Sequence, residues 1–274
     1  MKFIRSLGLM SGTSMDGLDC GLFDISLTSD YQLDWKLIDF KTIPYSKKIR
    51  NMLAESIYSK YDINQNLDDE LGRVFVSFIN KFLKDRSVEI IASHGQTISH
   101  KDGISSTQIG NPLFIYKEYN VPVIYNFRQA DIDAGGNGAP LMPFLDWLLF
   151  RDENMEIVTI NIGGISNISY IPSSSIREKI RGFDTGPGMA LIDETCRLYL
   201  SVDMDKDGFY ASKGEVNNEL LNQLMSHKFI SKVPPKSTGR DIFGVNLIKE
   251  VHKERPDIAI EDLLRTFCAF TAKS

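Results

Sequence analysis

Two glycine-rich turns carry residue types that could bind phosphate. Each turn follows an apolar run and leads into a second β-rich run. The candidate phosphate contacts are Gly12, Thr13, Ser14, Asp16 and Gly17 in the first turn, and Asn161, Gly163 and Gly164 in the second. Backbone N–H groups and hydroxyls of such a turn point into one concavity that suits an anion. One turn alone fits a plain hairpin equally well, but two, placed as a duplication would place them, suggest that related halves grip phosphates.

Carboxylates beside the first turn could also position a metal ion. Mg²⁺ often binds through one or two carboxylates plus phosphate, so Asp16 or Asp19 could hold it through water, although either could equally cap the turn. No Gly-Lys-Ser or Gly-Lys-Thr occurs in this turn, so it is not a Walker A motif. The run 203–208 imitates a calcium loop but lacks the bidentate glutamate at the twelfth position, which favours a surface turn.

Asp184 is the candidate general base. It stands between Phe183 and the rigid turn 185–188, which contains Pro187 and leads into an expected helix. A carboxylate held by a fixed backbone at a helix N-terminus has the placement that a general base needs. The competing interpretation, which the sequence alone favours, is an aspartate that caps the helix.

Two further segments could contact a substrate. His94 follows a buried strand, where α/β folds place ligand groups, and a sugar-hydroxyl contact or a structural hydrogen bond suits it. A metal site there is disfavoured, because no cysteine or third histidine joins His94 and His100. The loop 127–140 combines charges with closely spaced glycines, which let a backbone approach a ligand. Arg128 in this loop could bind a carboxylate, or it could form an incidental salt bridge.

Hydrophobic periodicity predicts the elements that position these residues. In the first half, at 1–150, strands at 3–9, 18–28 and 33–43 form an antiparallel meander, followed by helices at 46–58 and 67–85, a buried strand at 88–93, a short helix after Pro112, a strand at 121–125 and a helix at 141–150. In the second half, at 151–274, a strand pair at 156–171 precedes helices at 189–200, 215–226, 240–252 and 258–274. The pattern predicts an α/β fold in two lobes. The last helix ends in mid-pattern, so we expect a partner surface for its apolar face and a fold that is not complete at this point.

Composition narrows the class of protein. The chain has 274 residues, 42% of them hydrophobic and 24% charged, with a net charge of −5. No basic run is dense enough to follow a nucleic-acid backbone, and no apolar run approaches the ~20 residues that cross a bilayer. Cys20, Cys196 and Cys268 are odd in number and far apart, which indicates free buried thiols in a reducing compartment. We therefore expect a cytoplasmic protein without nucleic-acid or membrane partners.

Six segments resemble the anhydro-N-acetylmuramic acid kinase family in type and order. They are 10–17 (MSGTSMDG), 93–97 (SHGQT), 135–141 (GGNGAPL), 161–167 (NIGGISN), 183–188 (FDTGPG) and 236–240 (KSTGR). They span nearly the whole chain, so the match is more specific than any single motif.

The resemblance implies an actin-like ATPase fold of the sugar kinase and Hsp70 type, which is ribonuclease H-like, with duplicated mixed sheets and with ATP and Mg²⁺ between two lobes. It implies 1,6-anhydro-N-acetylmuramic acid as substrate, opened by water while ATP phosphorylates O6, and a homodimer. Asp184 matches the catalytic aspartate that deprotonates the water. The implied sugar contacts are His94, Gln96, Thr97, Arg128, Asp131, Gly138, Ala139 and Pro140.

The chain departs from the family pattern in two ways. Met189 stands where the family usually has Asn, which removes one polar contact. Family members also continue past Ser274 with a glycine-rich adenosine-binding motif and a further active-site glutamate, so we expect an incomplete second lobe and weak or absent kinase activity from the chain as it stands. Two alternatives remain open: a different sugar kinase of the same fold, and a sugar-binding or regulatory protein that lacks ATP turnover.

Overall fold

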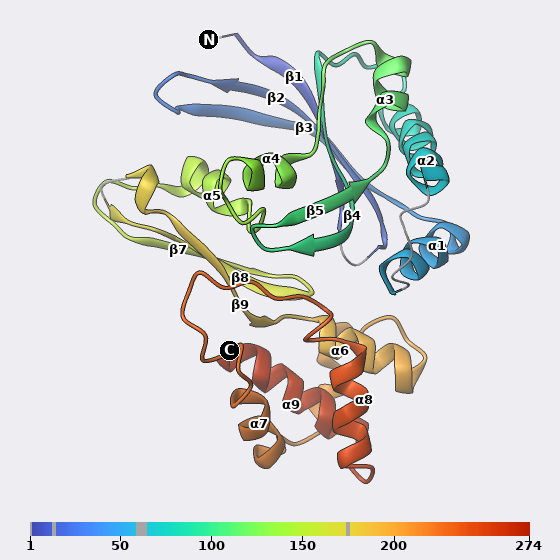
Figure 1. The fold of residues 1–274 in the computed structure, drawn as a ribbon, viewed down its shortest axis with the longest axis vertical. Coiled ribbons are helices and arrows are strands. Elements are labelled where there is room, and N and C mark those ends of the chain that lie inside the picture. The colour runs from blue at the N-terminus through green and yellow to red at the C-terminus, as the bar shows by residue number, and fades with distance from the viewer. Residues whose placement is uncertain (1, 13–14, 59–64, 174–175) are drawn as a thin grey trace. The chain divides into compact units, whose positions relative to one another are not determined.

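The computed structural model describes residues 2–12, 15–58, 65–173 and 176–274. The chain divides into two compact units, an N-terminal unit of Met1–Leu141 and a C-terminal unit of Met142–Ser274. Helix α5 (Met142–Phe150), which the sequence pattern assigned to the end of the first half, packs against strands of the C-terminal unit. Both units combine strands and helices, so the predicted α/β class is confirmed (Figure 1).

The N-terminal unit is built on a mixed sheet with the strand order β3-β2-β1-β4-β5. Strands β1 (Ile4–Ser11), β2 (Gly17–Leu27) and β3 (Leu33–Pro44) form the predicted antiparallel meander. Strand β4 (Ile90–Lys101) runs parallel to β1, and the short β6 (Val123–Ile124) runs parallel to β4. Strand β1 therefore lies inside the sheet, with a neighbour on each side.

Strand β4 is longer than the sequence predicted. It continues through residues 94–97, which were expected to end the strand, and pairs antiparallel with β5 (Ser105–Ile109). The polar residues His94, Gln96 and Thr97 hid this hairpin, because alternation of apolar and polar side chains is the usual signal of a strand. The segment 127–140 was likewise expected to be a loop, but its first half is helix α4 (Phe127–Asp133).

Helices α1 (Lys47–Tyr58) and α2 (Gln65–Leu83) pack against this sheet, and α3 (Pro112–Tyr119) lies along α2 (Figure 1). Helix α2 buries Leu71, Phe75 and Ile79 completely, on the predicted apolar face. Helix α3 begins where predicted, because the Asn111 side chain accepts a hydrogen bond from the N–H of Leu113 (3.0 Å).

The C-terminal unit contains a three-stranded antiparallel sheet in the order β7-β8-β9. Strands β7 (Ile157–Ile162) and β8 (Ile165–Ile171) form the predicted pair. Strand β9 (Arg181–Pro187) includes residues 185–187, which were expected to belong to a turn, because glycine and proline are depleted in strands. Within the described residues β7 pairs with β8 alone, and its Val158, Ile160 and Ile162 side chains are exposed.

Helices make up the rest of the C-terminal unit. They are α6 (Ala190–Thr195), which continues as a π turn through Leu200, α7 (Asn218–Met225), α8 (Val245–Glu254) and α9 (Ile260–Lys273). The predicted apolar face of α9, with Leu264, Phe267 and Phe270, is fully buried against this unit's own helices. Phe243 joins that core, with its ring 5.9 Å from the ring of Phe270.

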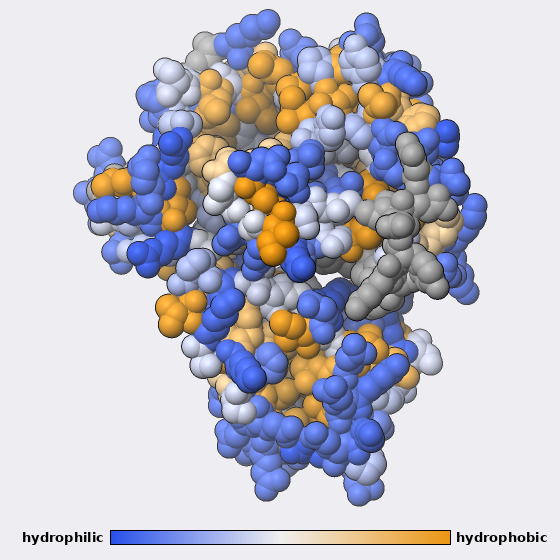
Figure 2. Space-filling model, in the orientation of Figure 1, coloured by the Kyte–Doolittle hydropathy of each residue, from blue (hydrophilic) through white to orange (hydrophobic). Residues whose placement is uncertain are grey.

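The expectation that all three thiols are buried is correct for Cys20 and Cys196 but not for Cys268, which is half-buried. Hydrophilic side chains cover the outer ends of α7 and α8 on the face drawn in Figure 2. Cys20 and Cys196 are buried thiols, and burial raises their pKa values to about 12 and about 11. Among the described helices, none combines the length and the apolar character needed to span a membrane.

Candidate active-site clusters

The first glycine turn is held by side chains from neighbouring strands. The Gly12 carbonyl accepts hydrogen bonds from the N–H of Met15 (3.1 Å) and from the Gln96 side-chain amide (3.2 Å). The Ser11 hydroxyl donates to the Gln96 Oε1 (2.6 Å), so the Tyr45 hydroxyl, 2.7 Å from Ser11, must donate in turn. Gln96 is fully buried. This network gives Gln96 a part in shaping the turn.

Two of the remaining candidate residues near this turn, Gly17 and Thr97, have defined contacts. The other two, Thr13 and Ser14, lie outside the described residues. Gly17 is required by packing, since a Cβ there would lie 2.3 Å from the Ile43 carbonyl oxygen. Thr97 accepts a hydrogen bond from Gln108 within the β4–β5 hairpin (3.3 Å).

The two aspartates near the turn are not equivalent as metal ligands. The Asp19 carboxylate already accepts a hydrogen bond from the Thr42 hydroxyl (2.5 Å). Asp16 is exposed, and its main-chain carbonyl accepts the N–H of Tyr45 (3.0 Å), which fixes the backbone beside the turn. No cluster of three metal-binding side chains occurs within the described ranges. A single exposed carboxylate beside a phosphate site fits Mg²⁺ that is carried by a nucleotide.

Four predicted substrate residues of the N-terminal unit, His94, Arg128, Asp131 and Gly138, come together beside the middle of β4. Arg128 donates from Nε to the His94 Nε2 (3.0 Å) and from Nη1 to the Gly138 carbonyl (2.8 Å). The Gly138 N–H donates to the Asp131 carboxylate (2.8 Å). Ala139 and Pro140 follow Gly138 directly and are half-buried. Helix α4 thus supplies Arg128 and Asp131 to one cluster with β4 and the glycine loop.

The His94 ring has one defined protonation state in this cluster. Its Nδ1 lies 2.8 Å from the Gly95 carbonyl, which can only accept, so Nδ1 carries the proton. Nε2 is then free to accept from Arg128. Burial lowers the pKa of His94, the Gly95 hydrogen bond opposes this shift, and the Arg128 charge adds to it. The imidazole is therefore neutral and holds the guanidinium in one orientation.

Glycine at 138 is a conformational requirement. Gly138 has a φ of 77°, and a Cβ there would lie 2.8 Å from the Ile132 Cδ1. A Cβ at Gly136 would lie 2.2 Å from the Asp131 carboxylate. The glycines of this loop therefore allow a close approach to the protein's own residues, the Asp131 carboxylate among them, and the predicted approach to a ligand stays a prediction.

The second glycine turn is held by main-chain hydrogen bonds. The Gly164 carbonyl accepts the N–H groups of Gly188 and Ala190 (both 3.0 Å), and the Gly163 carbonyl accepts that of Met189 (2.8 Å). Within the described part of the chain, the N–H groups of Gly163 and Gly164 donate to no other residue. The fold thus uses the carbonyls of the turn, and the N–H groups stay available to an anion.

The neighbours of the second turn also include a cation. The Arg240 guanidinium lies against Gly164, where a Cβ would be 3.3 Å from Nη2. Its Nη1 donates to the Glu194 carboxylate (2.8 Å), which also accepts from Arg197 (3.0 Å). Asn161 is exposed on β7, and its register partner is Asn167. Met189, at the position where the family pattern has Asn, packs on the hydrophobic core.

Asp184 does not lie at a helix N-terminus, and that prediction is wrong. It lies within β9, six residues before α6 begins, with Asn167 as its register partner. The carboxylate is almost buried, at 9% exposure. Its Oδ2 accepts the N–H of Thr238 (2.9 Å), and its own N–H donates to the Lys236 carbonyl (3.0 Å). A strand, pinned by a distant loop, gives Asp184 the fixed placement that was expected from a helix.

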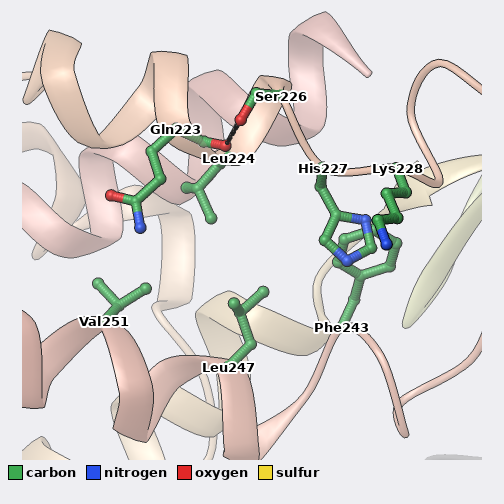
Figure 3. Close-up of a pocket in the computed structure, with 8 residues that line it drawn as sticks. All are labelled: Gln223, Leu224, Ser226, His227, Lys228, Phe243, Leu247 and Val251. Carbon is green, nitrogen blue, oxygen red and sulfur yellow. Dashed lines mark hydrogen bonds between the residues drawn. The ribbon is translucent and has the colours of Figure 1, made fainter.

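A pocket of about 480 Å³ lies elsewhere, between α7 and α8 (Figure 3). Leu224, Leu247 and Val251 point toward its interior, and the His227 ring lies beside Phe243. The lining includes none of the predicted site residues. Four apolar residues line it, and so do the polar residues Gln223, Ser226, His227 and Lys228.

Comparison with known proteins adds an independent finding. Residues 4–274 match the family model described as anhydro-N-acetylmuramic acid kinase. A protein of that name from Clostridioides difficile (strain 630) is 41% identical over 98% of this chain and 74% of its own length. Another of that name, from Bacillus thuringiensis (strain Al Hakam), is 39% identical over the whole chain and 74% of its own length.

Proposed function

Because this chain belongs to the anhydro-N-acetylmuramic acid kinase family, we propose that it converts 1,6-anhydro-N-acetylmuramic acid and ATP to N-acetylmuramic acid 6-phosphate. The family is one of ATP-dependent sugar kinases, and the reaction belongs to peptidoglycan recycling. The observation that carries the proposal is the family match over residues 4–274. The near-burial of the Asp184 carboxylate, to which the family resemblance gives the catalytic role, supports it. In this proposal the reaction takes place in the cytoplasm, and the active form of the enzyme is a homodimer.

Asp184 acts as the general base on water. The water attacks C1 of the sugar, and its proton passes to the carboxylate, as in glycosidases that invert configuration. The Thr238 N–H on Oδ2 fixes the direction of the carboxylate without protonating it. Burial among strand residues excludes other solvent, which strengthens the interaction of the carboxylate with the attacking water.

The bond from C1 to O6 breaks as O6 takes the γ-phosphoryl group of ATP. Phosphoryl transfer removes the negative charge that develops on O6, so no separate acid is needed. Mg²⁺ bound with ATP neutralises charge on the phosphates. In this proposal Asp16 holds that ion through water, and the N–H groups of Gly163 and Gly164 bind phosphate oxygens. The exposure of Asp16 and the lack of another acceptor for these two N–H groups among the described residues support the two roles.

The cluster of His94, Arg128, Asp131 and Gly138 beside β4 binds the sugar. Arg128, whose orientation His94 and the Gly138 carbonyl fix, recognises the carboxylate of the sugar's lactyl group. Asp131 orders the glycine loop through Gly138. We assign Thr97, Ala139 and Pro140 to the same sugar site, and Gln96 to the support of the first turn beside it.

Isotope labelling tests the proposal. The protein expressed from its complete gene is supplied with ATP, Mg²⁺ and the anhydro sugar in water enriched in ¹⁸O. We expect release of ADP that depends on the sugar, and a 6-phosphate product with one ¹⁸O on C1. ADP release without the sugar, ¹⁸O in phosphate, or binding of the sugar without turnover would contradict the proposal, and the last result would favour a sugar-binding protein.

A further inference from the structure

The segment 236–240 matches the family pattern, but neither the motif nor the proposed chemistry gives it a role. It follows α7 in the chain and comes back to β9, where it contacts Asp184 twice through the main chain. The Asp184 N–H donates to the Lys236 carbonyl (3.0 Å), and the Thr238 N–H donates to the Asp184 carboxylate (2.9 Å). The position of this segment therefore decides where the carboxylate points.

The Lys236 side chain ties the segment to the core. Its ammonium group donates to the carbonyls of Phe229 (3.2 Å) and Ile230 (3.1 Å), and it lies 4.6 Å from the centre of the Phe229 ring. Lys236 is only 8% exposed. Phe229 in turn packs edge-on against Phe243, with ring centres 5.7 Å apart. Through these contacts the segment is fixed to the helical core.

A buried lysine is costly, and this one has few compensating groups. Burial lowers the pKa of Lys236, the carboxylate of Asp184 on β9 opposes that shift, and Lys232 in the same connecting segment adds to it. A neutral side chain of the same length would fill the space without the cost of removing a charge from water. A cation at this place is therefore better explained by what it does to its neighbours.

We propose that Lys236 is a positioning residue for Asp184. It holds the segment that aims the Asp184 carboxylate, and its charge favours the ionised form of that carboxylate, the form that accepts a proton from water. The inference rests on the proposed role of Asp184 as the general base. It predicts that loss of the lysine weakens the base and leaves the binding of the sugar intact.

The test compares Lys236→Met with the wild-type protein expressed from its complete gene. We expect kcat to fall about a hundredfold, because small displacements of a catalytic group have effects of that order, with KM for the sugar unchanged. The acid limb of kcat/KM moves to higher pH, because a lost cation raises the pKa of a nearby carboxylate. By ¹³C NMR, the Asp184 carboxyl, assigned by its absence in Asp184→Asn, titrates about one pH unit higher.

Lys232→Met is the matched control, because Lys232 is exposed and lies in the same connecting segment. It should keep the wild-type kcat and Asp184 titration. Lys236→Gln keeps one donor for the two carbonyls and removes the charge, so it should lose less kcat than Lys236→Met and show the same direction of titration shift. It serves as the test variant if Lys236→Met does not fold.

The inference is wrong if kcat and the Asp184 titration match the wild type in either folded Lys236 variant. It is also wrong if kcat falls while the titration and the acid limb stay in place, because a purely structural lysine would give that result. Failure of the proposed function is separate: the wild-type protein would then not convert the sugar, whereas the NMR titration would still report on Lys236 and Asp184.

Discussion

The two glycine turns, which we propose as phosphate sites, are held in place by different supports. In the first, the Gly12 carbonyl depends on the Gln96 side chain, which depends on Ser11. In the second, the carbonyls of Gly163 and Gly164 accept N–H groups of the backbone at the start of α6. One substitution can remove a side-chain support, whereas a main-chain support fails only when the backbone is displaced. The two turns should therefore respond to different kinds of mutation.

The same contrast holds for the residues beside each turn. In the N-terminal unit, Arg128 is oriented by the His94 ring as well as by a carbonyl. In the C-terminal unit, Asp184 forms hydrogen bonds with the main chain of Lys236 and Thr238. The orientation of Arg128 is thus open to change by a substitution at His94, whereas Asp184 depends in part on the backbone of the segment that Lys236 anchors.

The largest effect on stability is expected from Gly188→Ala. A Cβ at this position would lie 2.1 Å from the Gly163 carbonyl oxygen, so the backbone of the second turn has to move. We expect a loss of about 3 kcal/mol in the free energy of unfolding, measured with urea. Gly163→Ala is the matched control, because its nearest contact would be an ordinary 3.6 Å, and it should unfold like the wild type. Equal stability of the two variants would contradict the claim that main-chain hydrogen bonds hold the second turn.

Next in size is Gln96→Leu, which breaks the support of the first turn. The change removes one donor to the Gly12 carbonyl and leaves the Ser11 hydroxyl without its buried acceptor. We expect a cost of about 2 kcal/mol in the free energy of unfolding, with weaker ATP binding by calorimetry. Gln108→Leu, in the adjacent strand of the hairpin, should keep the ATP affinity. If Gln96→Leu binds ATP as tightly as that control does, the side chain does not shape the turn.

Gly163→Ala also tests whether glycine is required at this position for ATP binding and not for stability. The fold leaves room for a methyl group at Gly163, so glycine is required there only if a ligand approaches the backbone closely. We expect ATP affinity to fall about tenfold, which corresponds to about 1.4 kcal/mol. Unchanged affinity in calorimetry would place the phosphates away from the second turn.

The smallest expected effect is a pH dependence of the free energy of unfolding that comes from His94. The pKa of His94 is lowered in the folded protein, so the unfolded chain binds the proton more readily. The contribution of the neutral ring to stability is present above the unfolded pKa of about 6.5 and is lost as pH falls below it. His94→Asn should therefore flatten the change in urea stability between about pH 7 and pH 5 relative to the wild-type protein. A slope equal to that of the wild type would contradict the assignment.

The sequence predicted the parts of the fold that periodicity marks. The meander of β1 to β3 and the apolar face of α2 are regular patterns, and both were correct. The extension of β4 and the whole of β9 were missed, because polar residues in one and glycine with proline in the other conceal a strand.

The candidate site was predictable in its residue types more than in its geometry. Asp184 stood out through its glycine-rich neighbours, but its position within a strand did not. The contact between Thr238 and Asp184 joins residues 54 apart in sequence, and a contact of that range has no local signal. The motif 236–240 was recognisable in the sequence. The contacts of Lys236, and those of its segment with Asp184, are seen only in the structure.

The most direct test of the central claim, that Asp184 deprotonates the attacking water, is the turnover of Asp184→Asn in the protein expressed from its complete gene. The substitution keeps the size of the side chain and an oxygen that can accept from Thr238, and it removes the base. We predict that kcat falls by about 10³-fold or more, while calorimetry gives a wild-type affinity for the sugar. Turnover at the wild-type rate would contradict the claim, and so would a loss of sugar binding that accounts for the whole defect.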